Sequence, residues 1–329
     1  MEEENGGLQV FGTGAIKDEP DNRDYQYADV ALSFPPFDWE KGYDVEEVIG
    51  KKLNVKDQNG SGSCGGQAWS YYGQVLDPDK DEKSAKFIYS QTFVKPAGSA
   101  GRTNSTLVTN KGWGTEKLTP SYDNGFPPSE SFMQRPEDIT PQAFIQAATD
   151  KALSYANVLI DVDSLAQAIR NNSGCIIGIT GKNNGTWQTK FPLPPTTVDS
   201  TSWNHWVYCG KAKMINGKKY IGFINSWGIT TGEQGWQWVT EDYLKSPFVW
   251  SAWTLVYNFP KPVNYIFTTF MKQGSRGGEV KELQKRVNAL PVDGIFGPKT
   301  KAKVQLWQSS HGLTADGMVG PLTRAVLNK

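Results

Sequence analysis

The sequence predicts an α+β protein in which a mainly helical part precedes a mainly β-stranded part, followed by a small all-α domain. From residue 67 to about residue 93 the apolar and aromatic side chains have helical spacing. From Cys175 onward, short β-type runs alternate with turns. The tail after residue 268 repeats a pattern of one turn followed by one amphipathic helix. Helices first and strands later indicate two subdomains.

Length and composition limit the class of protein. The chain has 329 residues, enough for about two domains. With 38% hydrophobic, 12% aromatic and 21% charged residues, it has the material for a folded core. Its apolar runs are too short to span a bilayer, and the segment Met1–Asn5 lacks the basic and apolar regions of a secretory signal. Three cysteines cannot form a disulfide framework, so at least one thiol is free.

The first part of the chain contains an arm and several short helices. Residues 1–45 are rich in glycine, proline and aspartate and are expected to form an extended arm over a domain surface. The helical stretch at 67–93 precedes a loop-rich region, Gly98–Tyr122. Two short helices follow, one opened by Thr140 with Pro141 in its first turn and one spanning Asp163–Ile169.

Buried or half-buried strands are expected in the second part, at Cys175–Thr180, Trp206–Gly210, Lys219–Asn225, Trp236–Thr240 and Ala252–Tyr257. Cys175 and Cys209 would lie on neighbouring strands, as small buried residues or, alternatively, as a disulfide. Asp161 and Asp163 are interpreted as solvated helix caps rather than metal ligands. His311 is expected in an exposed loop.

The tail contains an internal repeat. Val292–Thr300 and Ala315–Thr323 share the pattern x-Asp-Gly-x-φ-Gly-Pro-x-Thr, where φ is apolar. Glycine permits a tight turn, and proline suits the first turn of the helix that follows. With a further helix near Val280–Val287, this predicts three short helices around a small core.

The net charge of zero hides an asymmetry. The tail from residue 268 carries ten basic and four acidic residues, whereas the preceding residues carry 24 basic and 30 acidic ones. A module with a net charge of +6 is attracted to anionic partners. The tail has no nucleic-acid motif, and a solvated basic surface without a partner is the alternative.

One set of residues predicts nucleophilic catalysis. Cys64 directly precedes a helical pattern, where the partial positive charge of a helix N-terminus is expected to lower the pKa of its thiol. His205 is one of only two histidines, and Asn225 follows it by twenty residues. An asparagine amide oxygen can accept the second N–H of the imidazole and so fix its orientation.

These residues carry a family resemblance. Gln58, Cys64, His205 and the run Asn225-Ser226-Trp227-Gly228, in this order, resemble the papain-like cysteine peptidases. The bacterial and phage branch is most similar, because there an arm of the Pro-Asp-x-Arg-Asp type, here residues 20–24, precedes the nucleophile. The resemblance covers about residues 14–258 and implies a helical subdomain facing a β-barrel subdomain.

The resemblance also implies a role for each matched residue. Cys64 would be the nucleophile, His205 the general acid and base, and Asn225 the residue that orients the imidazole. Gln58 would donate to the oxyanion, and Trp227 would shield the His–Asn hydrogen bond from water. Two positions depart from the family pattern. Gly65 replaces the usual tryptophan after the nucleophile, and Ser61 stands where many relatives carry a disulfide cysteine.

The tail resembles the three-helix peptidoglycan-binding domain over about 60 residues. Its matches include the Asp-Gly turns, Trp307-Gln308 and Gly312-Leu313. This resemblance implies binding of bacterial cell-wall polymer near the turns, with candidate contacts Asp293, Gly294, Phe296, Trp307, Asp316 and Gly317. Because bacterial walls are commonly anionic, the basic charge of the tail would attract it to the wall.

The combined prediction has four parts: an arm (1–45), a papain-like cysteine peptidase domain (46–258), a proline-containing linker (259–267) and a peptidoglycan-binding domain (268–329). Together they predict a lysin-like peptidoglycan endopeptidase that works through an acyl-enzyme. The alternatives are a wall- or virion-anchored peptidase that cleaves proteins, and a catalytically dead wall-binding protein.

Peptidoglycan and a peptide or protein are the expected partners, with no cofactor, metal or nucleic acid. The enzyme would reach the wall by lysis, non-classical export or virion delivery. The arm is expected to be a structural element rather than an inhibitor.

Overall fold

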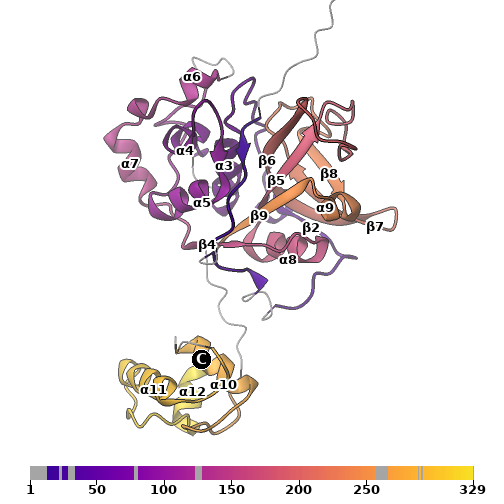
Figure 1. The fold of residues 1–329 in the computed structure, drawn as a ribbon. Helices are drawn as coiled ribbons and strands as arrows, with labels where there is room; N and C mark the ends of the chain where they lie inside the picture. The colour runs from indigo at the N-terminus through magenta and orange to yellow at the C-terminus, as the bar shows by residue number, and fades with distance from the viewer. Residues whose placement is uncertain are drawn as a thin grey trace, which may run out of the picture. The chain divides into compact units, whose positions relative to one another are not determined.

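The computed structural model describes residues 13–21, 24–28, 34–77, 81–122, 128–256, 266–287, 289 and 292–328. Most of the expected linker, and parts of the expected arm, lie outside these residues. The chain divides into two compact units, Met1–Asn258 and Phe259–Lys329. The first unit combines helices with a sheet and the second is helical, which confirms the predicted fold class (Figure 1).

The helical subdomain contains α3 (Cys64–Leu76), α4 (Ala85–Thr92), α5 (Gly101–Asn110), α6 (Glu130–Met133) and α7 (Pro141–Ala147), with short elements α2 (Val45–Ile49) and η1 (Pro136–Asp138) beside it. The single helix expected over 67–93 is wrong. The chain leaves helical geometry at Asp77, and a new helix begins where the Ser84 hydroxyl accepts a hydrogen bond from the Phe87 N–H. Thr140 caps α7 as predicted.

α5 lies in a region that was expected to be loop. Its N-cap residue, Ala100, offers no side-chain hydrogen bond. The arm supplies the cap instead, because the Asp18 carboxylate accepts from the Arg102 N–H at 3.1 Å. This signal lies 84 residues away in sequence, so local pattern analysis could not detect it.

The second subdomain is a seven-stranded sheet with the order β4-β9-β5-β6-β7-β8, in which β2 also pairs with β6. Its strands are β2 (Tyr43–Asp44), β4 (Ser154–Asn157), β5 (Cys175–Lys182), β6 (Ser202–Ile215), β7 (Lys218–Ile224), β8 (Trp236–Thr240) and β9 (Val249–Val256), and neighbouring strands are antiparallel. All five expected strands are present. β6 and β7 are joined by Asn216-Gly217, both with positive φ, as a two-residue hairpin turn requires.

Two large cores hold the described part of the first unit together, beside a smaller cluster around Tyr89 and Phe132. One lies between α3 and the sheet and includes Trp69 and Trp206, whose rings meet edge to face at 5.4 Å. The other packs the sheet against α8 (Val162–Asn172) and α9 (Glu241–Lys245). Cys175 and Cys209 are register partners in this second core and are free, buried thiols, which confirms the prediction of small buried residues. Asp161 caps α8, as predicted, whereas Asp163 is no cap and instead accepts hydrogen bonds from Trp39 and Lys219.

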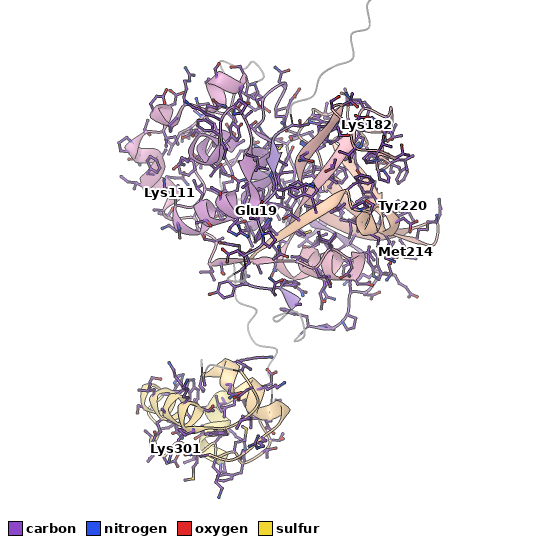
Figure 2. All side chains as sticks on the ribbon, viewed as in Figure 1. Glu19, Lys111, Lys182, Met214, Tyr220 and Lys301 are labelled. Carbon is purple, nitrogen blue, oxygen red and sulfur yellow. The ribbon has the colours of Figure 1, made fainter. Side chains whose placement is uncertain are left out.

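The arm runs along the seam between the helices and the sheet, where Figure 2 shows Glu19. Its strand β1 (Ala15–Ile16) pairs in parallel with β3 (Ser99–Ala100), beside α5. Arg102 of α5 binds Asp24 through two nitrogens, at 2.9 and 2.6 Å. Further along, Tyr27 lies in the core against α8. The arm is therefore an integral part of the first unit.

The second unit is a three-helix domain of α10 (Gly278–Arg286), α11 (Pro298–Ser310) and α12 (Pro321–Leu327). The sequence repeat has a structural counterpart. Gln284 donates to Asp293, Ile295 O and Thr300 and accepts from Gly294 N. Gln308 makes the same set with Asp316, Met318 O, Thr323 and Gly317 N. Each half thus has one buried glutamine that closes its Asp-Gly turn.

Candidate active site

Cys64 is the first residue of α3, at the junction of the two subdomains. The N-cap residue Ser63 makes no capping hydrogen bond with its side chain, because its hydroxyl contacts Ser61 and Gln67 instead. The N–H groups of Cys64 and Gly65 therefore remain available to the sulfur, and both act to lower the pKa of the thiol.

The predicted lowering of the Cys64 pKa is nevertheless wrong for this conformation. The side chain has no exposed surface, and this burial raises the pKa of the thiol to about 12. The helix N-terminus and the backbone N–H groups of Trp206 and Gly14 act in the opposite direction, but burial outweighs them. The prediction considered only the helix and not the segment that covers it.

His205, on β6, is paired with Asn225 at the end of β7. The imidazole Nε2 lies 2.9 Å from Asn225 Oδ1. The other ring nitrogen, Nδ1, is buried and has no hydrogen-bond partner among the described residues. Burial lowers the pKa of His205 to about 4, so the ring is neutral at pH 7. Cys64 contacts the backbone of Trp206, the residue after His205, but no hydrogen bond joins the thiol to the ring in this part of the structure.

Gln58 lies beside this pair. Its Oε1 accepts from the hydroxyl of Ser226, the residue after Asn225, at 2.5 Å. Its Nε2 donates to Ser61 O at 2.7 Å, three residues before Cys64. The structure thus brings the Gln58 amide to the loop that precedes Cys64. The hydrogen bonds of Oε1 and Nε2 fix the orientation of this amide.

Aromatic rings enclose the histidine. Trp227 stacks on the imidazole with a centroid distance of 4.7 Å and an interplanar angle of 28°. Trp203 meets the imidazole edge-on at 6.1 Å, and Trp187 packs against both tryptophans. Because these rings exclude water, the His205–Asn225 hydrogen bond lies in a medium of low dielectric constant, where it is stronger than in solvent.

The arm covers Cys64. The Gly14 N–H acts on the Cys64 sulfur and also donates to Asn204 O at 3.2 Å, while Gly14 O accepts from Ser99 N at 2.8 Å. A Cβ on Gly14 would lie 2.0 Å from Gly62 O, so only glycine fits here. The arm therefore packs directly against Cys64 and the Gly62 loop.

A hydrogen-bond network holds the loops on one side of Cys64. Glu130 accepts from Gly62 N and from the Tyr89 hydroxyl. The same hydroxyl accepts from Gly98 N at 2.7 Å. Tyr89 and Glu130 thus join the Gly62 loop to the Gly98 loop.

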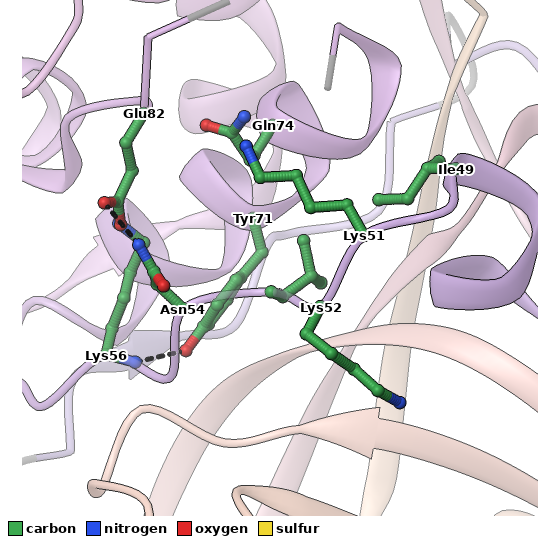
Figure 3. A pocket seen from close by; sticks show the side chains of 9 residues that line it. Ile49, Lys51, Lys52, Asn54, Lys56, Tyr71, Gln74 and Glu82 are labelled. Atoms are coloured by element: carbon green, nitrogen blue, oxygen red, sulfur yellow. Dashed lines mark hydrogen bonds and ion pairs between the residues drawn. The ribbon is translucent and has the colours of Figure 1, made fainter. Parts of the chain in front are cut away.

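Charged side chains, among them Lys51, Lys52, Lys56 and Glu82, line a small pocket (Figure 3). There Lys56 binds Glu82 at 2.8 Å, and its backbone N–H donates to the Tyr71 hydroxyl at 2.6 Å. Tyr71 in turn donates to Asn225 O at 3.3 Å. Through Tyr71, these bonds connect the segment around Lys56 to Asn225 at the end of β7.

The candidate wall-binding residues of the tail fall into different classes. Phe296 is fully buried and therefore belongs to the core, which corrects its assignment as a ligand contact. Gly294 and Gly317 form the two turns with positive φ. Asp293 and Asp316 are exposed, although each accepts hydrogen bonds within its own turn. Trp307 is half-buried and stacks on the exposed His311 at 4.0 Å.

The first unit has a fold of two subdomains, with Cys64 at the start of α3. The first unit is similar to xylellain, a cysteine protease from Xylella fastidiosa, with 23% identity and a TM-score of 0.60 over 76% of this chain and 97% of that one. Procathepsin B from Trypanosoma congolense is similar at 12% identity, with a TM-score of 0.58 and coverage of 75% and 87%. Procathepsin L 3 from Tenebrio molitor larval midgut is similar at 17% identity, with a TM-score of 0.54 and coverage of 75% and 76%. The fold is therefore papain-like, as the sequence predicted.

Residues 276–327 match the family described as "Putative peptidoglycan binding domain". The chain is also 46% identical over 58 residues to the zinc D-Ala-D-Ala carboxypeptidase of Streptomyces albus G. That match spans 16% of this chain and only 23% of that protein. The described residues contain no group of three or more His, Cys, Asp or Glu side chains that could hold a metal ion. Of the helices in the described ranges, none combines the length and apolar character that crossing a membrane requires.

Sequence reasoning did not find two residues of the site. Gly14 lies in the arm, and only its contact with Gly62 makes a glycine necessary. Gln237 lies on β8 and accepts a hydrogen bond from the Asn225 amide at 2.8 Å. A glutamine within the aromatic strand Trp236–Thr240 was the available signal, because a polar residue in a buried strand requires partners.

Proposed function

We propose that this chain is a cysteine peptidase targeted to the bacterial cell wall, where it acts as a lysin-like peptidoglycan endopeptidase. The observation that carries the proposal is the combination, in one chain, of a papain-like fold holding Cys64, His205 and Asn225 with a peptidoglycan-binding tail. A tail bound to the wall raises the local concentration of the peptidase at wall peptides.

The proposed mechanism uses the side chains described above. His205 Nδ1 takes the proton of Cys64 Sγ, and the sulfur attacks the peptide carbonyl. The oxyanion receives hydrogen bonds from the Cys64 N–H and Gln58 Nε2. The imidazolium then gives its proton to the leaving amine, and water hydrolyses the thioester with His205 acting as base. Asn225 and Trp227 keep the ring oriented and dry throughout.

This reaction requires movement of the arm, so we further propose that the described conformation is latent. Gly14 blocks Cys64, and the arm is retained by the pairing of β1 with β3 and by the bonds from Arg102 to Asp18 and Asp24. Two of the similar structures are themselves proenzymes by name. This proposal replaces the expectation of a purely structural arm, although Tyr27 and Phe37 still give the arm a part in the core.

Hydrolysis of purified cell walls tests the function. Wild type, a deletion of residues 1–16 and the same deletion carrying Cys64→Ala would be incubated with walls of several chemotypes, and the release of free amino groups measured. We expect release by the deletion variant and none by the deletion variant that carries Cys64→Ala. Casein, as a soluble protein substrate, distinguishes the alternative: cleavage of casein without release from any wall would refute the peptidoglycan endopeptidase.

A further inference from the structure

Gln237 on β8 is fully buried beside the His205–Asn225 pair. Its Nε2 donates to two backbone carbonyls, Trp187 O at 2.9 Å and Thr189 O at 2.7 Å. A carbonyl oxygen can only accept hydrogen bonds. The amide of Gln237 is therefore fixed, with its nitrogen toward the two carbonyls and its oxygen toward Asn225.

This fixed oxygen determines how the Asn225 amide is placed. Asn225 Nδ2 donates to Gln237 Oε1 at 2.8 Å, and Asn225 Oδ1 accepts from Ser226 N, also at 2.8 Å. The two contacts act together to hold the amide in one orientation, because Gln237 Oε1 needs a donor and Ser226 N needs an acceptor. Asn225 consequently presents oxygen to His205 Nε2.

The Asn225 oxygen in turn determines the tautomer of His205. A ring nitrogen facing an oxygen must carry the proton, so Nε2 is protonated and Nδ1 keeps its lone pair. In the opposite orientation Asn225 would present N–H to Nε2 and drive the proton to Nδ1. An imidazole protonated at Nδ1 cannot take the thiol proton from that side.

We propose that Gln237 is a positioning residue for the hydrolysis proposed above, fixing the Asn225 amide and thereby the His205 tautomer with the proton on Nε2. The inference rests on the proposed function for its catalytic consequence, but the tautomer itself can be measured without any substrate.

A purely structural role for Gln237 would be to anchor the 187–190 segment to β8. That segment has other anchors, because Gly232 N donates to Gln188 O and Trp238 N donates to Lys190 O, both at 2.9 Å. Loss of the Gln237 side chain therefore leaves the segment attached and removes the acceptor that faces Asn225.

The test is nitrogen NMR of the full chain labelled at histidine, recorded at pH 7. The chain has two histidines, and His311→Ala identifies the signal of His205. We expect the Nε2–H tautomer in wild type and a mixture with Nδ1–H in Gln237→Met, which keeps the side-chain length but has no acceptor. In the variant lacking residues 1–16, adding Gln237→Met should lower the kcat of hydrolysis by roughly 10- to 100-fold at unchanged KM, as for other supporting hydrogen-bond partners.

A second substitution separates orientation from packing. In Asn225→Asp the carboxylate presents oxygen to His205 in either orientation, so adding Gln237→Met should leave the Nε2–H tautomer in place. Nδ1–H in wild type, or an unchanged tautomer in Gln237→Met, would overturn the inference. If the tautomer shifts as expected but no variant cleaves walls or casein, the proposed function fails and the positioning role stands.

Discussion

Replacing Gly14 by alanine tests whether the arm holds Cys64 in an unreactive state. The new Cβ would lie 2.0 Å from Gly62 O and 2.7 Å from Gly62 C, far inside van der Waals contact. Both atoms are backbone, so neither can rotate aside. The arm must therefore lift away from the sulfur, while Asp18 and Asp24 remain bound to Arg102.

The size of the effect follows from the burial of the thiol. With the arm in place, burial raises the pKa of Cys64 to about 12, compared with about 8.5 for an ordinary cysteine. At about 1.4 kcal/mol per pKa unit, ionising the covered thiol costs roughly 4–5 kcal/mol more than ionising an ordinary one, so at least a thousand-fold less thiolate is present at pH 7. Opening the arm restores this thiolate and also exposes the sulfur to reagents.

The rate of alkylation by iodoacetamide at pH 7, followed by mass spectrometry, measures this change. We expect Gly14→Ala to react at Cys64 about 100- to 1000-fold faster than wild type, while the buried Cys175 and Cys209 stay unmodified. Gly60→Ala is the matched control, because a Cβ at Gly60 meets nothing within 4 Å. A folded Gly14→Ala protein that reacts at the wild-type rate would refute the reasoning.

Three further predictions concern stability. Burial lowers the pKa of His205 to about 4, so its contribution is complete above the unfolded pKa of about 6.5 and is lost as the pH falls toward 4. Measured by urea unfolding, the free energy of unfolding should fall by about 3 kcal/mol between pH 7 and 4 because of His205. His205→Gln should make the free energy of unfolding depend less steeply on pH. Tyr89→Phe removes the bonds to Glu130 and Gly98 and should lower the free energy of unfolding by about 1–3 kcal/mol; an unchanged urea midpoint would contradict this. Gln284→Met and Gln308→Met each remove four hydrogen bonds and should each destabilise the tail by about 2–4 kcal/mol. Faster amide exchange confined to the tail would confirm the last prediction, and exchange that also rises in the first unit would argue against it.

The sequence was most informative where the signal is local. Strands such as Trp236–Thr240 and the caps at Thr140 and Asp161 depend on neighbouring residues, and the structure has all of them. The residue types at 64, 205 and 225 indicate one chemistry only in combination. Their order along the chain therefore carried the prediction of the fold and of the candidate site.

What the sequence could not reveal depends on distant contacts. α5 is capped from the arm, so no residue next to its first turn indicates where it begins. The pKa of Cys64 is governed by burial beneath Gly14, fifty residues earlier in the chain, which outweighs the local helix N-terminus. Gln237 stands out in the sequence as a polar residue in an aromatic strand, but its partner Asn225 is identified only when β8 is paired beside β7.

The network of Tyr89 and Glu130 has a chemical consequence for the conditions in which this site can operate. A thiol nucleophile is preserved by reducing agents, yet the same agents break a disulfide that braces a cleft. Here hydrogen bonds hold the Gly62 and Gly98 loops together, and the three cysteines are all unpaired. Dithiothreitol can therefore protect the sulfur from oxidation without loosening the scaffold around it.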